Sequence, residues 1–488
     1  MIAIDRSLLN ADGSPDVTLL QAVLLKQDEV IKKRLLPLYK IYNRDHAITE
    51  RIRLLGLPNN KLVHDFPKYI STMASGYLVG KPVQYKAPDE AKEAYKKLNE
   101  ALEKAKSDCT DSELAMDSSI YGKGVELCYS DGNADVKSSS ISPLFGFVVY
   151  DDTVEHKSLF GVMVTIKTNK TLTETGRRVT VYTPTQIVEY DSTSSANTWA
   201  LPTETKRTAH HFGGVPMIEY WNNETETGDF EPAISLINAY DELQSDRVND
   251  KQQFTDAIMV LKGMRGLEKP AAKEIDPSDP DYAAKVANEE LKGNLTPSEY
   301  LAQAKTLSVP KDGDAGYLVK PDGETANELL RKSVADDIHK FTFVPNLTDE
   351  KFAGISSGVA MRFKLLGLEQ LTGIKERWFR EALRIRLRLF ANFLSLKGAA
   401  DLDIDKIQIS FSRSLPVNEL EIAQTLQAYK DLVPDELLMS QVPFVEDADK
   451  AVKDMQKQRA DRAKESAMMF ATTPLKANTA SGNEEKAK

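Results

Sequence analysis

The residues of this chain whose types could do chemistry begin with a short acidic run. Asp152, Glu155 and Lys157 follow a β-like stretch and loosely resemble the acidic–acidic–lysine metal site of many nucleases. That spacing is common by chance when 28% of residues are charged, and the run lies in an expected turn. A solvated turn is the favoured interpretation, and a metal-dependent nuclease stays open as an alternative function.

Two other motifs lack the partners that their chemistry requires. The run Gly76-Tyr-Leu-Val-Gly80-Lys81 looks like a phosphate-binding loop, but its glycines are one residue too close together. Pro82 also stands where a Ser or Thr hydroxyl should bind magnesium, which favours a plain turn after a helix. His210 and His211 have no companion Cys or His at the spacing of a zinc site. The sequence therefore predicts no catalytic residue, no cofactor-binding residue and no metal ligand.

Length and composition predict a large soluble protein that does not attract DNA through its overall charge. A chain of 488 residues exceeds one ordinary core, so we expect about two to four domains. The formal net charge of −10 excludes simple polyelectrolyte attraction, so any contact with DNA should be local and weak. Cys109 and Cys128 give no disulfide framework, and no apolar run approaches the ~18 residues of a membrane span. We expect a protein that is assembled in the cytoplasm and has no membrane partner.

Hydrophobic periodicity divides the first half of the chain into helices followed by strands. Residues 16–50, 62–78 and 87–105 have helical patterns. The texture then changes to a period of two, which is typical of strands. The expected strands are Tyr121–Tyr129, Leu144–Tyr150, Leu159–Lys167, Arg178–Tyr182, Gln186–Tyr190 and Pro216–Trp221. This region predicts a mostly antiparallel sheet beside the helices.

Two helices that flank a small inserted module come next. The first is predicted over 231–262, with a proline in its first turn. Its centre, Gln244–Gln253, has a single aliphatic residue, so it should be solvated or packed against polar neighbours. The module at 264–322 should contain a hairpin from Thr306–Val309 to Tyr317–Val319. The second helix has one apolar stripe, which consists of Leu330, Val334, Ile338 and Phe341.

A further helical segment is unusually long. After Pro345, a polar loop with Gly354 and Gly358 leads into about 40 residues of helical periodicity, or roughly 60 Å. One apolar stripe consists of Leu368, Leu371, Ile374, Trp378, Ala382, Ile385, Leu389, Phe393 and Leu396, and a second of Phe379, Leu383, Leu387, Phe390 and Leu394. We expect this wide face to be buried and the opposite face to carry Arg377, Arg380, Arg384 and Arg388. Such a helix indicates an architectural element rather than a catalytic pocket.

Several strings of this sequence together resemble the portal proteins of tailed bacteriophages, in the branch typical of long-tailed phages of Gram-positive hosts. The strings are Asp65–Val83, His211–Pro216 with Trp221–Asn223, Leu243–Asp250, Phe352–Ala360, Gly367–Gln370 and Phe411–Pro416. No single string is diagnostic of a chemistry. Their order between residues 60 and 420 is that of the family.

The resemblance implies an α+β, mainly helical fold with the portal architecture of wing, stem, clip and crown and a very long wing helix. It also implies a homo-oligomeric ring, usually a dodecamer, at one vertex of the capsid. The implied domains are a wing at 1–230 and 359–412, stem helices at 231–262 and 324–343, a clip at 263–323, a tunnel loop at 344–358, a crown at 413–470 and a disordered tail at 471–488.

By the same resemblance, the ring is a virion component through which double-stranded viral DNA is packaged and ejected. Its implied partners are the terminase motor, the head–tail connector, and the major capsid and scaffolding proteins. Implied DNA-channel residues of the tunnel loop are Asn346, Thr348, Asp349, Lys351, Phe352, Gly354 and Ser356, and implied stem residues are Gln244, Asp246, Arg247, Asn249, Asp250, Lys332 and Lys340. Besides the nuclease, another head–tail connector component with a helical hairpin stays open as an alternative.

Overall fold

The structure, a computed structural model, falls into two units. It describes residues 1–53, 58–192, 199, 202–255, 258–262, 277–278, 282, 285–286, 314–318, 324–347, 358–399, 402–413, 419–430, 432–440, 442, 445 and 448–471. The first unit comprises Met1–Asn346 and Leu365–Ser414, and the second comprises Leu347–Lys364 and Leu415–Lys488.

Two sheets make up most of the β-structure of the first unit. Its strands are β1 (Ile2–Ile4), β2 (Gln84–Lys86), β3 (Lys123–Ser130), β4 (Val136–Ile141), β5 (Gly146–Asp151), β6 (Ser158–Thr168), β7 (Glu174–Tyr182), β8 (Gln186–Ser192), β9 (Thr203–Ala209), β10 (Met217–Trp221), β11 (Ile258–Lys262), β12 (Asp314–Leu318) and β13 (Gln408–Ser410). The larger sheet has the order β1-β5-β6-β7-β8-β9, with β1 parallel to β5 and the other neighbours antiparallel. A three-stranded antiparallel sheet has the order β10-β3-β4. The predicted mostly antiparallel sheet is therefore confirmed.

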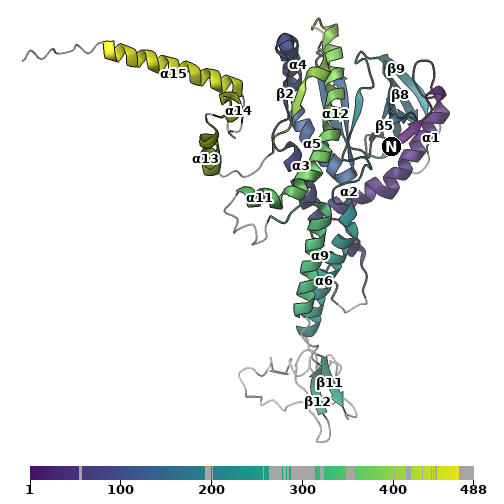
Figure 1. Ribbon diagram of the computed structural model, residues 1–488. Helices are drawn as coiled ribbons and strands as arrows, with labels where there is room; N and C mark the ends of the chain where they lie inside the picture. Colours follow the sequence, from purple (N-terminus) through teal and green to yellow (C-terminus); the bar gives the residue numbers. More distant parts are fainter. Residues whose placement is uncertain are drawn as a thin grey trace, which may run out of the picture. The chain divides into compact units, whose positions relative to one another are not determined.

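Helices of the first unit lie beside these sheets, except α6 (Ile234–Thr255) and α9 (Glu324–Thr342), which project away from them (Figure 1). The others are α1 (Val17–Val30), its π-helical continuation η2 (Ile31–Leu35), α2 (Leu36–Tyr42), α3 (Phe66–Val79), α4 (Lys92–Ala105), α5 (Ser107–Tyr121) and α12 (Leu366–Leu396). The sequence pattern does not predict α5, because its buried face includes Thr110, Asp111 and Ser118. Among the described residues, no helix combines the length and apolar character that a membrane crossing requires.

The larger sheet has apolar side chains on both faces, as the alternation along β5 requires. Phe147 and Val149 belong to a core that α1 closes with Leu24. The intervening Val148 and Tyr150 belong to a second core, shared with the three-stranded sheet. The two sheets therefore pack face to face, and α1 covers the outer face of the larger one.

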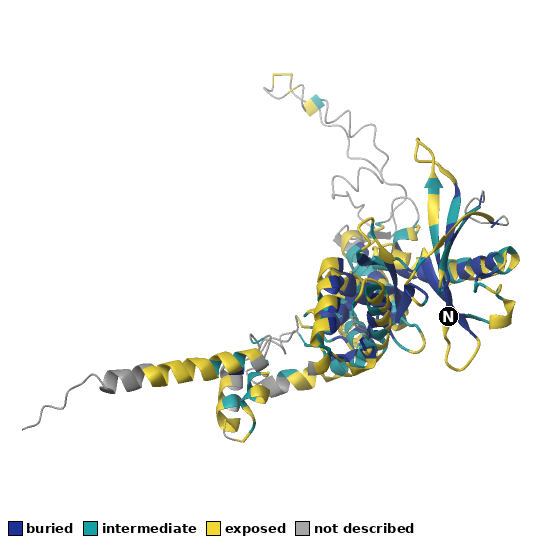
Figure 2. Ribbon diagram, turned by 90° about the horizontal axis from the view of Figure 1, so that it is seen from above, coloured by how far each residue is buried: buried dark blue, intermediate teal, exposed yellow. Residues whose placement is uncertain are grey.

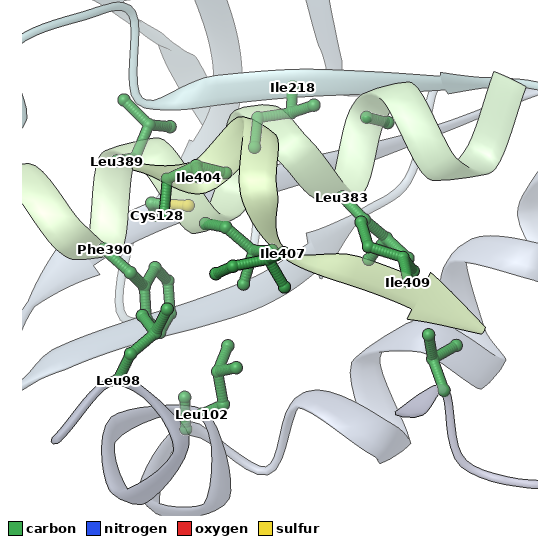
Figure 3. Packing of buried hydrophobic residues seen from close by; sticks show 14 of the residues in the cluster. Leu98, Leu102, Cys128, Ile218, Leu383, Leu389, Phe390, Ile404, Ile407 and Ile409 are labelled. Carbon is green, nitrogen blue, oxygen red and sulfur yellow. The ribbon is translucent and has the colours of Figure 1, made fainter. Parts of the chain in front are cut away.

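A third and larger core surrounds α12. Figure 3 shows Leu383, Leu389 and Phe390 of α12 meeting side chains from α4, β3 and β10 and from residues 404–409. Figure 2 shows that buried residues concentrate in the region where these elements meet. The predicted architectural role of the long helix thus has a physical basis, since α12 contributes to the core along several turns.

The first of the two stripes predicted for the long helix is buried in part, at Leu368, Ala382 and Leu389. Ile374 and Ile385 are 48% and 42% exposed, and Trp378 is half-buried. The second stripe is buried from Phe379 to Phe390. The helix lies on the outside of its core, so the core covers the second stripe and part of the first instead of the whole apolar face. The predicted single helix is also interrupted at Leu365, which separates α11 (Gly358–Lys364) from α12.

The first of the two paired helices is shorter than predicted. The expected helix over 231–262 ends at Thr255, and Ile258–Lys262 forms β11, which pairs antiparallel with β12. Ile, Met, Val and Leu in succession favour a strand once a partner is available. Tyr317 does lie in a strand, but the partner expected for it at 306–309 lies outside the described residues.

The second unit is helical where it is described. It contains α11, α13 (Glu419–Tyr429), α14 (Asp435–Met439) and α15 (Ala448–Ala471). α14 packs against α15, on which Val452 is buried. Most other described side chains of α15 are exposed. The tail expected at 471–488 lies outside the described residues apart from its first residue.

Candidate functional site: the helix pair α6–α9 and the segment bound to it

The helices α6 and α9 lie side by side and project away from the sheets (Figure 1). Arg331 of α9 donates to the hydroxyl of Tyr240 at 3.1 Å, and Arg247 of α6 pairs with Glu328 at 2.8 Å. Because the contacts advance along α6 and retreat along α9, the pair is antiparallel. Hydrogen bonds from Arg331, with a smaller contribution from Arg247, lower the pKa of Glu328 to about 2. Glu328 is therefore ionised at physiological pH and links the two helices.

An extended segment at residues 58–64, here called the strap, binds the other side of α6. The Asn60 backbone N–H donates to Asn249 at 2.8 Å, the Leu62 N–H to Ser245 at 2.9 Å, and the His64 N–H to Asp241 at 2.9 Å. Alternate residues of an extended chain point the same way, and every fourth residue of a helix lies on one face. The strap thus runs antiparallel to α6, and its backbone donors are satisfied by side chains of the helix.

Two histidines close the upper end of this contact on the fully buried Asp241. His46 Nδ1 lies 2.5 Å from one carboxylate oxygen, and His64 Nδ1 lies 2.8 Å from the other. Burial raises the pKa of Asp241, but the hydrogen bonds from His46 and His64 outweigh it and leave the pKa lowered. A carboxylate with these donors on both oxygens is held ionised inside the fold.

The strap explains why the centre of α6 is polar. The sequence predicts that this centre is solvated or packed against polar neighbours. The polar neighbours belong to the same chain: Asn249 lies under the strap, and Asp246 pairs with both Arg51 and Arg53. On the face toward α9, Gln244 donates to the Tyr240 hydroxyl at 3.2 Å.

The remaining implied stem residues lie on more open surfaces. Lys332 and Lys340 of α9 are exposed, and Asp250 of α6 is half-buried. Of the four residues in the predicted stripe of α9, Ile338 is buried and Val334 is half-buried. Leu330 and Phe341, at the two ends of the stripe, are 52% and 51% exposed. Apart from Ile338, the apolar side chains of α9 are therefore partly left to solvent in the single chain.

Of the implied tunnel-loop residues, Asn346 is the one that the structure describes. The others, Thr348, Asp349, Lys351, Phe352, Gly354 and Ser356, lie outside the described residues.

The chain at the start of that loop and after it is fixed to α3. The Tyr69 hydroxyl donates to the Pro345 carbonyl at 2.8 Å, at the start of the loop. The Tyr77 hydroxyl donates to Glu369 at 2.8 Å, after it. Arg413 also pairs with Glu369, at 3.2 Å. Burial and the neighbouring Glu369 raise the pKa of Tyr77 to about 12, so its proton stays in the hydrogen bond.

Two buried cations of α12 were missed by the sequence analysis, which placed arginines on the outer face alone. Arg386 is fully buried between Asp111, at 2.6 Å, and Glu126, at 2.7 Å. Lys375 is buried against Asp229 at 2.5 Å. The signal was present, because positions 375 and 386 are three helical turns apart and both fall in line with the stripe that begins at Phe379.

Neither the suspected nuclease residues nor another acidic group forms a metal site among the described residues. Asp152, Glu155 and Lys157 are exposed in the turn between β5 and β6, and Lys157 pairs with Glu155 at 2.6 Å. Within the described part of the chain, no group of three or more His, Cys, Asp or Glu side chains could hold a metal ion.

Comparison with known proteins identifies the family. A family model described as "Phage portal protein, SPP1 Gp6-like" matches residues 21–465. The portal protein of Bacillus phage SPP1 is 23% identical over 467 residues, which cover 89% of this chain and 85% of the relative. The portal protein of Clostridium phage phiCD119 is 24% identical over 252 residues, covering 50% of this chain and 48% of the relative. The resemblance found in the sequence is therefore confirmed: this chain belongs to the SPP1 Gp6-like family of phage portal proteins.

Proposed function

We propose that copies of this chain form a ring at one capsid vertex, through which viral DNA is packaged and later ejected. One observation carries the proposal: an antiparallel helix pair projects from the sheet-and-helix body and leads into the β11–β12 ribbon. A stem needs such a pair, since helices hold a fixed length and leave their outer faces for neighbouring subunits. Family membership supports the same assignment.

The exposed face of α9 is the proposed contact surface inside the ring. Leu329, Leu330 and Phe341 are 66%, 52% and 51% exposed, which suits burial against a neighbouring stem. Lys332 and Lys340, eight residues apart, are exposed on the same helix, and the exposed Asp336 lies midway between them. Two cations separated by an anion would touch phosphates weakly, as a passage for moving DNA requires.

Residues 344–358 are the proposed tunnel loop. Its anchoring by Tyr69 and Tyr77 supports this role, because a loop that meets moving DNA needs fixed ends. Lys351 and Phe352 are the proposed contact residues. Asp349 and Glu350 beside Lys351 would keep its attraction to phosphate weak and salt-sensitive.

The remaining assignments follow the chain order of the family. Residues 263–323 would form the clip that docks the head–tail connector, and 413–470 the crown. The terminase, the major capsid protein and the scaffolding protein complete the proposed partners. The net charge of −10 per chain would make a ring strongly anionic, so DNA would slide rather than adhere.

The mass of the purified native oligomer tests the proposal most directly, together with electron micrographs of the same sample. We expect closed rings, of about twelve subunits, with a central channel. A monomer, or an open filament at every protein concentration, would contradict the ring. A variant with Lys332→Glu and Lys340→Glu should still form rings but should package less DNA, whereas Lys170→Glu, in the exposed β6–β7 turn, should package normally.

A further inference from the structure

A half-open apolar cavity lies between the first helices and the larger sheet, apart from the helix pair and its strap. Its volume is about 270 Å³. One wall comes from α1, η2 and α2, and the other from β5 and β6 with neighbouring residues. Its rim exposes Leu36, Phe145 and Ile166 by 37%, 45% and 44%. Apolar side chains gathered around an open cavity are typical of an interaction site.

Gln27 supplies the cavity with an unused polar group. Its side chain lines the cavity and is 4% exposed, yet its amide Nε2 has no acceptor among the described residues. A buried donor without an acceptor destabilises a fold, and a ligand carbonyl that accepts from Nε2 would remove that loss. The wall next to Gln27 is π-helical over Ile31–Leu35, a geometry that is frequent at functional sites.

The charges around the cavity favour an acidic ligand. Asp28 is engaged, because its carboxylate accepts from the indole N–H of Trp199 at 2.9 Å. Arg177 stacks over Trp199 with its guanidinium carbon 5.1 Å from the ring centre, and pairs with Glu174 at 3.3 Å. Lys32 is exposed at the cavity and has no ion pair within the described structure. The unmatched charge at this site is therefore positive.

We propose that this cavity binds a peptide segment of another protein that carries a large apolar side chain next to an acidic residue. The apolar side chain enters between the helices and the sheet, the backbone carbonyl beside it accepts from Gln27 Nε2, and the acidic residue pairs with Lys32. This binding site does not depend on the proposed channel, so each can fail without the other.

A random-peptide display library, panned against the purified full-length oligomer, tests the site. The recovered peptides should share an aromatic or large aliphatic residue beside Asp or Glu. When one of them is synthesised, its affinity should fall about tenfold for Gln27→Leu and for Lys32→Glu, and should weaken with salt in the wild type. Lys26→Glu is the matched control, because Lys26 is exposed on the same helical stretch and does not line the cavity.

Three results would overturn the proposal. Recovery of no binding peptide would exclude a peptide site of useful affinity. Recovered peptides that bind Gln27→Leu and Lys32→Glu as tightly as the wild type would place binding elsewhere. If a second copy of this chain displaced the peptide and bound the cavity as tightly as the peptide does, the cavity would be a contact between subunits. Equal oligomer mass and circular dichroism for the variants and the wild type keep loss of fold from imitating loss of binding.

Discussion

Asn249 accepts two hydrogen bonds from Asn60, one from the backbone N–H and one from the side-chain amide, each 2.8 Å long. Asn249 is fully buried, and 189 positions separate the two residues in the chain. One side-chain oxygen thus fixes both the position and the rotamer of its partner. The strap is held to α6 at this point, six residues before the helix ends at Thr255.

Replacing Asn249 by alanine should release the N-terminal part of the strap, around Asn60, from α6. The Asn60 N–H would lose its acceptor, and because Asn60 is half-buried the loss should be about 0.5–1.5 kcal/mol. We expect faster hydrogen exchange at Asn60 and Leu62 and a lower midpoint of denaturant unfolding. Lys332→Ala, on the exposed face of α9, should change neither. Unchanged exchange at Asn60 would show that Asn249 does not hold the strap.

The buried triad of Arg386 from α12, Asp111 from α5 and Glu126 from β3 makes a second prediction. Arg386→Met leaves the carboxylates of Asp111 and Glu126 buried without their cation, which should cost about 3–5 kcal/mol of unfolding free energy. Adding Asp111→Asn and Glu126→Gln should restore most of that loss. Arg388→Met removes a surface pair with Asp405 and should cost less than about 1 kcal/mol. Equal unfolding free energies for the two arginine variants would refute a structural role of the triad.

Two adjacent aromatic residues of α12 should differ in their effect on stability. Phe379 is 1% exposed, so Phe379→Ala should cost about 3–5 kcal/mol through the cavity that it leaves. Trp378 is half-buried against Trp221, with ring centres 5.2 Å apart, so Trp378→Ala should cost clearly less. Chemical denaturation of both variants measures the difference. A larger loss for Trp378→Ala would mean that a neighbouring subunit completes its burial.

The stability of the chain should depend on pH through Asp117. Burial raises the pKa of Asp117 from 3.8 to about 7, against a weak hydrogen bond from Ser140. Between these values the folded state binds more protons than the unfolded state, so the contribution of Asp117 to stability falls as pH rises. The effect of Asp117→Asn on the unfolding free energy should therefore be more stabilising at pH ~8 than at pH ~5, by about 1–3 kcal/mol. Asp152→Asn, in an exposed turn, should behave alike at both pH values.

The proposed tunnel loop predicts a defect in packaging without a defect in assembly. Lys351→Glu reverses the charge that would touch phosphates, and Phe352→Ala removes an aromatic contact. Capsids built with either variant should form normally, and a smaller fraction should be filled with DNA. The control is Lys170→Glu, which makes the same charge change on the exposed β6–β7 turn. Normal filling with both loop variants would make the loop passive.

Much of the fold could be predicted from patterns that a single element carries by itself. The alternation of Val, Ile and Tyr along β5 to β8 is of this kind. Ile374 and Ile385 could not be distinguished from core residues, because periodicity gives the direction of a side chain but not the presence of a partner. The resemblance to the portal family could be predicted from the order of several strings, although no single string contains residues that are diagnostic of a function.

The contacts of the candidate site were harder to predict, because they join polar residues far apart in the chain. Asp241, Ser245 and Asn249 do repeat every four residues, which is a visible sign of a polar helix face. The sign does not identify its partner, since the strap contributes backbone N–H groups that every non-proline residue has. The partners of the buried Arg386 could not be predicted for a related reason, because its two carboxylates come from α5 and β3.

The strap can occupy α6 in one register. Two residues of extended chain and one four-residue step of helix both advance about 6 Å, so a sliding strap would next fit after a displacement of two residues. In one direction that displacement brings Pro58 to Asn249, and proline has no N–H to donate. In the other it brings Phe66 to Asp241, but Phe66 already begins α3. The strap therefore has a fixed register on α6. A force on α6 along its axis would be transmitted through the strap to α3, because the strap cannot slide along the helix.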